Sequence, residues 1–146
     1  MKNNLIFSGT ILANLLLTNI PVNANSIKVQ EFTLQQSTVG SGCSVIFFKP
    51  QHKNKNLFLF IYIIQGEMEM RLNGKMVKFK QVKEYTSNPK YYQADFISKD
   101  GKIKVKVNGK IGKKIGEEVT EIINGSLILK KGNQEVKFNV IGELGC

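Results

Sequence analysis

The sequence is poor in the residues that enzymes and metal sites most often use. Among its 146 residues it has one histidine, two cysteines and no tryptophan. A zinc site draws three or four ligands from Cys, His, Asp and Glu, and a nucleophile needs a base beside it. The one histidine, His52, lies in a polar stretch that predicts a solvated loop. We therefore expect no metal, no cofactor and no enzymatic activity.

The 11 acidic residues form no pattern typical of a paired general acid and base. Glu67 and Glu69 share one face of a predicted strand but adjoin a hairpin, and Glu117, Glu118 and Glu121 are balanced by nearby lysines. Catalysis would require acids that are distant in the sequence to meet in the fold.

The first 24 residues have the pattern of a signal peptide. Lys2 supplies a positive charge, residues 5–17 are mainly apolar, and Val22-Asn23-Ala24 fits a cleavage site. A spanning helix needs about 20 predominantly apolar residues, so an uncleaved anchor is the less favoured alternative. We expect cleavage near Ala24, a periplasmic or secreted protein, and a single β domain over residues 25–146.

Both cysteines follow a glycine: Cys43 comes after Gly40-Ser41-Gly42, and Cys146 is the last residue. An exported chain meets oxidising conditions, where two cysteines and no others indicate one disulfide. We predict a Cys43 to Cys146 bridge that ties the carboxyl end to the front of the fold.

The chain is strongly basic, with a formal net charge of +10. Such an excess predicts an acidic partner, such as an anionic surface of polysaccharide or lipid headgroups. Arg71 is the only arginine among 21 basic residues, although arginine is the residue that binds phosphates and bases through two parallel hydrogen bonds. We therefore expect no nucleic-acid partner. Compositional drift toward lysine is the alternative origin of the charge.

Beyond the cleavage site, apolar residues recur with period two, and turn signals follow at short intervals. This predicts an all-β fold: an antiparallel meander of about nine strands that closes as a barrel or folds as a sandwich. The first strand is expected over 27–34. Asn73-Gly74 and Asn124-Gly125 predict hairpin turns, and residues 108–116 predict a flexible, lysine-rich connection.

Two strands could form a binding surface. Lys102, Lys104 and Lys106 alternate with apolar residues and predict an anion-binding face, or a solvated face that resists edge pairing. Residues 57–64 are all apolar, so both faces of that strand need cover. The cover could be the chain itself, a second copy in a homodimer, an envelope protein partner or an apolar small ligand. The candidate residues for binding or self-association are Phe58, Phe60, Tyr62 and Ile64.

The signal peptide, Gly40-Ser41-Gly42-Cys43, the 67–79 hairpin and the terminal Gly142-Glu143-Leu144-Gly145-Cys146 resemble a group of small exported cyanobacterial proteins of unknown function. The resemblance implies an envelope location and no catalytic residues. The leading hypothesis is an exported, non-enzymatic β-domain that serves as a binding or structural module of the cell envelope. The alternatives are an inhibitor-like module that binds a secreted hydrolase, which the basic charge disfavours, and a β-barrel carrier of a small apolar ligand.

Overall fold

A computed structural model of the protein describes residues 26–84 and 88–146. The expected signal peptide lies outside these residues. The described part contains two short 3-10 segments and nine strands, which confirms the predicted all-β class. In chain order the elements are β1 (Val29–Gln30), η1 (Leu34–Gln36), β2 (Ser44–Phe48), η2 (Pro50–His52), β3 (Phe60–Ile63), β4 (Met68–Leu72), β5 (Lys75–Glu84), β6 (Tyr91–Ser98), β7 (Ile103–Ile115), β8 (Val119–Lys131) and β9 (Gln134–Gly145).

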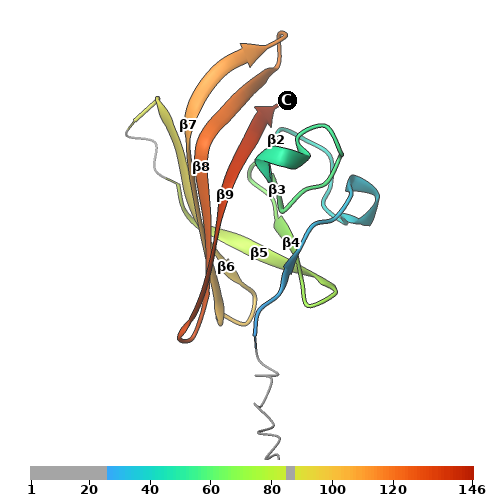
Figure 1. The fold of residues 1–146 in the computed structure, drawn as a ribbon, viewed down its shortest axis with the longest axis vertical. Helices are drawn as coiled ribbons and strands as arrows, with labels where there is room; N and C mark the ends of the chain where they lie inside the picture. The colour runs from blue at the N-terminus through green and yellow to red at the C-terminus, as the bar shows by residue number, and fades with distance from the viewer. Residues whose placement is uncertain (1–25, 85–87) are drawn as a thin grey trace, which may run out of the picture.

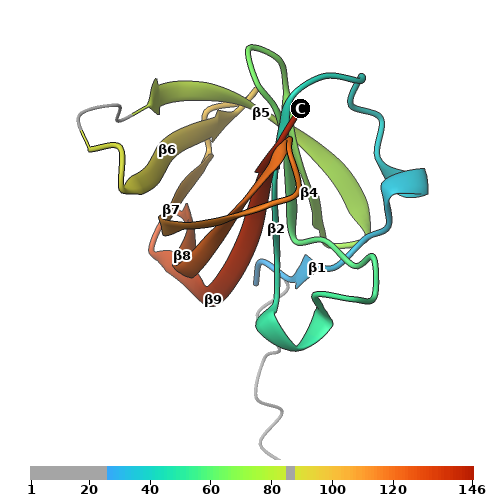
Figure 2. The ribbon, with the colours of Figure 1, turned by 90° about the horizontal axis from the view of Figure 1, so that it is seen from above.

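Strands β2 to β9 close into an eight-stranded antiparallel barrel (Figures 1 and 2). Each strand pairs with the next in sequence, and β9 returns to pair with β2, from Ser44 opposite Gly145 to Phe48 opposite Ile141. The sequence was compatible with a barrel or a sandwich. The pairing between β2 and β9, the first and last barrel strands, shows that the sheet closes as a barrel.

β1 fills a gap in the barrel wall. β3 pairs with only the first part of β4, at Met68 and Glu69. The last part of β4, at Arg71 and Leu72, pairs with β1 instead. Phe32 then bridges to Phe58, so the wall stays continuous. The predicted strand 27–34 is too long, because the chain leaves the sheet after Phe32. The Thr33 amide donates to the Gln36 side chain at 2.9 Å, which starts η1 instead.

Aromatic side chains fill the barrel interior. Alternation turns Phe47, Phe60 and Phe96 inward, and each is at most 1% exposed. Their rings meet edge to face, with centroids 5.4 Å apart for Phe47 and Phe60 and 5.2 Å apart for Phe60 and Phe96. Such rings bury large apolar areas and favour this geometry, so the interior is a packed core.

The predicted hairpin at Asn124-Gly125 is wrong, because β8 continues through it. Asn124 has a positive φ of 51°, and the pairing register shifts here, so the two residues form a bulge. A Cβ at Gly125 would lie 2.8 Å from the Asn108 carbonyl oxygen and 2.9 Å from that of Val140. The glycine is needed because both neighbouring strands approach it closely.

The predicted flexible connection over 108–116 is also wrong, since most of it belongs to β7. A Cβ at Gly109 would lie only 2.3 Å from the Ile122 side chain, so this glycine serves close packing between strands. Asn73-Gly74, in contrast, has positive φ at both residues, 50° and 81°. It forms the predicted hairpin turn between β4 and β5.

Candidate functional site

The strongest concentration of one kind of functional group is on the outer surface of β5 to β9. Inward positions of β7 and β8, such as Val105, Val107 and Leu129, are buried, and the alternating positions point outward. We call these outward, exposed lysines the basic wall: Lys80, Lys83, Lys104, Lys106, Lys110, Lys130 and Lys137.

Strand register arranges most of the basic wall into two rows that run across the strands. The first row is Lys80, Ile97, Lys104, Lys130 and Glu135, and the second is Lys83, Asp95, Lys106, Ile128 and Lys137. Neighbouring strands are about 4.8 Å apart, and residues two apart along a strand are about 6.7 Å apart. Many of the lysines are therefore within about one Debye length, 8 to 10 Å, of each other, and their potentials add.

The two acids in these rows neutralise the basic wall only in part. Lys130 lies 2.8 Å from Glu135, and Lys106 lies 3.9 Å from Asp95. The two lysine side chains are 56% and 62% exposed, and exposed pairs of this kind contribute little to stability. Lys104, Lys110 and Lys137 form no ion pair with any residue that the structure describes. The wall therefore presents a net positive charge to solvent.

Of the three lysines predicted to form an anion-binding face, Lys104 and Lys106 belong to the basic wall. Lys102 is exposed but precedes β7, in the turn after β6. There the Asp100 carboxylate accepts hydrogen bonds from the Ser98 hydroxyl at 2.6 Å and the Lys102 amide at 3.1 Å, and these bonds lower the pKa of Asp100. Lys102 thus contributes at the margin of the wall.

The predicted apolar binding face does not form a surface. Phe60 and Tyr62 are buried inside the barrel, Phe58 is half-buried and Ile64 is 36% exposed. The Tyr62 hydroxyl donates to the Gln81 side chain at 2.7 Å and accepts from the backbone amide of Gln65 at 3.1 Å. The chain itself therefore covers Phe60 and Tyr62, the first of the alternatives considered from the sequence.

The outer surface of β2 to β4 differs from the basic wall because other parts of the chain lie over it. We call it the covered wall, with the outward residues Phe48, Ile61 and Glu69, each at most 3% exposed. The two 3-10 segments lie on this side of the barrel (Figures 1 and 2). The Glu69 carboxylate accepts hydrogen bonds from the Ser37 hydroxyl and the Thr38 amide, both at 2.9 Å, and from the Thr38 hydroxyl. Glu69 thereby fastens the segment after η1 to the barrel.

His52 is also structural. Its Nδ1 contacts one oxygen of the Glu31 carboxylate. The Lys49 Nζ lies 3.0 Å from the other oxygen. Burial by itself raises the pKa of Glu31, but the bonds to His52 and Lys49 outweigh it, so the pKa lies below its usual value. The cluster joins η2 to the segment after β1. It was missed from the sequence because its members are far apart along the chain.

The side chains that fill the barrel interior are uncharged among the residues that the structure describes. Glu69 is the one charged residue that is buried among the described residues, and it points away from the interior. The Tyr92 hydroxyl is buried and has no hydrogen-bond partner within the described part of the chain. Burial raises its pKa far above the usual value, with a smaller contribution from Glu84, so the phenol stays neutral.

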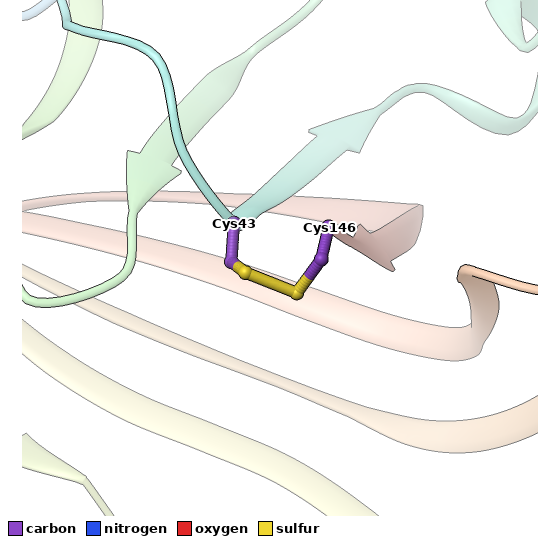
Figure 3. Close-up of a disulfide and its surroundings, with 2 residues drawn as sticks. All are labelled: Cys43 and Cys146. Carbon is purple, nitrogen blue, oxygen red and sulfur yellow. A yellow bond between two sulfur atoms is a disulfide. The ribbon is translucent and has the colours of Figure 1, made fainter.

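The predicted disulfide is present. Cys43 and Cys146 are bonded across 103 positions of sequence, with Cα atoms 4.0 Å apart (Figure 3). They flank the pair Ser44 and Gly145, the last pair of the seam between β2 and β9. The bridge therefore fastens one end of the line where the barrel closes.

Comparisons with models of protein families, with curated proteins and with solved structures found no match. Within residues 26–84 and 88–146, no three histidine, cysteine or acidic side chains gather as a metal site would require. In the same residues, no helix is long and apolar enough to cross a membrane.

Proposed function

We propose that the protein is an exported, non-enzymatic β-barrel that serves as a binding module of the cell envelope and holds an anionic partner on its basic wall. The observation that supports this most is the pair of cross-strand rows, in which six lysines accompany two acids. Export is supported by the signal-peptide pattern of residues 1–24 and by the disulfide. The resemblance to small exported cyanobacterial proteins agrees with an envelope location.

The fold suits this role because it holds the lysines on rigid strands. The inward neighbours of Lys104 and Lys106, Val105 and Val107, are buried in the core, so the strand that bears the charges is fixed. Each lysine has a flexible stem and a compact, hydrated charge. Such groups attract anions over a distance and tolerate many head groups. A module of this type selects charge density rather than one defined ligand.

The carrier alternative receives less support, because aromatic side chains occupy the barrel interior. The inhibitor-like alternative would need a surface complementary to a secreted hydrolase, and the dominant exposed feature is instead positive. A homodimer through Phe60 and Tyr62 is disfavoured because both are buried. Anion binding remains the function that the exposed groups favour.

The test is binding of labelled dextran sulfate, with uncharged dextran as the control probe, at low and high salt. The variant Lys104→Gln/Lys106→Gln/Lys130→Gln should bind at least about tenfold more weakly at low salt, since each lysine near an anionic surface contributes about 1 kcal/mol. High salt should remove most of the difference.

A matched variant, Lys28→Gln/Lys55→Gln/Lys75→Gln, removes the same charge from exposed positions outside the basic wall. It should keep its affinity within about twofold, because contacts with the wall are unchanged. Equal loss in both triple variants would show that only net charge matters and would contradict a site on the wall. No binding to dextran sulfate by the unaltered protein would also contradict it.

A further inference from the structure

We infer that the anionic partner is a linear anionic polysaccharide that crosses the strands and bends around the barrel, rather than a flat anionic membrane. The inference rests on the proposed function, because it takes the basic wall as the binding surface. It adds the chemical class of the partner and the path along which the partner lies.

The first argument is the curvature of the basic wall. In a closed barrel of eight strands, successive strands are turned by about 45° around the axis. Lys80 on β5 and Lys137 on β9 are four strands apart, so they face nearly opposite directions. Figure 2 shows β5 to β9 following this curve. A flat bilayer would reach the lysines of β7 and its neighbours but not both flanks, whereas a flexible chain can follow the curve.

The second argument is the spacing of the charges. The second row places lysines on β5, β7 and β9, that is, on every second strand. Strands two apart are separated by about 10 Å along the sheet. The first row adds Lys130 on β8, between two of these strands. A polymer with regularly repeated charges can therefore meet one lysine after another as it crosses the wall.

The third argument is the chemistry of the side chains. Arg71 lies on β4, outside the basic wall, so the wall lacks the planar fork that recognises one head group through two bonds. Ile97 and Ile128 lie between lysines of neighbouring strands and are half-buried. They offer apolar contact to the faces of sugar rings.

Two variants separate the two partners. The crest variant is Lys104→Gln/Lys106→Gln/Lys130→Gln, and the flank variant is Lys80→Gln/Lys137→Gln. The polysaccharide probe is polygalacturonate, and the membrane probe is a vesicle of phosphatidylcholine with anionic phosphatidylglycerol, compared at equal concentrations of accessible charge. All lysines changed are exposed, so circular dichroism and melting temperature should match the unaltered protein.

We expect polygalacturonate to bind more tightly than the vesicles. Both variants should lose affinity for polygalacturonate. The flank variant should lose at least about threefold, because each lysine near an anionic surface contributes roughly 1 kcal/mol. The flank variant should bind vesicles as the unaltered protein does. Affinity should rise with oligogalacturonate length until the chain can reach around the outside of the barrel from Lys80 on β5 to Lys137 on β9.

Tighter binding to vesicles, or a flank variant with full affinity for polygalacturonate, would overturn the polysaccharide inference and leave anion binding by the wall intact. Tighter binding to a single-stranded oligonucleotide than to polygalacturonate would overturn it as well. If polygalacturonate, dextran sulfate and anionic vesicles all fail to bind, the proposed function falls together with the inference.

Discussion

The covered wall and the basic wall belong to one barrel and share one core, yet their outer surfaces are opposite in character. On β2 to β4 the outward residues include Phe48, Ile61 and the buried Glu69. On β5 to β9 the outward positions include the exposed lysines of the basic wall, such as Lys104, Lys106 and Lys130. Alternation with period two therefore identifies the inward residues of a strand. Whether the outward residues are apolar or charged then indicates whether another part of the chain covers that face.

The largest expected effect comes from the covalent link between the two walls, since Cys43 precedes β2 and Cys146 follows β9. The variant Cys43→Ser/Cys146→Ser should lower the free energy of unfolding by about 4 to 5 kcal/mol, because the bridge closes a long loop in the unfolded chain. Urea denaturation checks this. A loss below about 1 kcal/mol would show that the seam holds without it.

The next effect distinguishes the two outer surfaces directly. Phe48→Ala should lower the free energy of unfolding by about 3 to 5 kcal/mol, as expected for a large side chain in a core. Ile128→Ala, at an outward position between lysines of the basic wall, should cost about 1 kcal/mol or less. Thermal and urea unfolding of both variants give the values. Equal losses of stability in the two variants would contradict the burial of Phe48 on the outer face of the covered wall.

A smaller effect tests how the covering segment is fastened. Glu69→Ala leaves the donors of Ser37 and Thr38 without their acceptor and should cost about 2 to 3 kcal/mol. Proteolysis between β1 and β2 should become faster, because the segment loses its anchor. Glu67→Ala is the control: Glu67 pairs with Lys78 at a half-exposed position, so its loss should destabilise the protein much less than the loss of Glu69.

The smallest effect concerns pH. The pKa of Glu31 is lower in the folded protein than its ordinary value of 4.5, so its contribution to stability is present above that pH and is lost as the pH falls below it. Glu31→Gln should therefore reduce the free energy of unfolding by up to about 1 kcal/mol at neutral pH. The difference from the unaltered protein should shrink in acid. A difference that is constant with pH would contradict this role for the carboxylate.

Local pattern predicted much of the framework. The strands β2 and β6 coincide with short alternating or apolar segments at 44–48 and 91–98. The unbroken apolar run at 57–64 correctly indicated a strand that needs cover on both faces, as the burial of Phe60 and Ile61 on opposite faces shows. In each case the signal lies within a few residues, so alternation and composition suffice.

Long-range contacts account for what was missed. Asn73-Gly74 and Asn124-Gly125 carry the same turn signal, but only the first is a hairpin, since the second is enclosed by β7 and β9. Alternation along one strand found Lys104 and Lys106. Lys80, Lys130 and Lys137 join them only through the cross-strand register of β5 to β9. Register of this kind cannot be read from a single strand.

The seam between β2 and β9 has a consequence for the order of folding. Every other pairing among β2 to β9 joins strands that are neighbours along the chain, whereas this one joins residues about a hundred positions apart. Non-local pairings of this kind form slowly, because the loop entropy is lost before any contact is gained. The cysteines meet only at the end of that seam, so their oxidation marks molecules whose barrel has closed. Trapping free thiols during refolding would therefore count the chains that are still open.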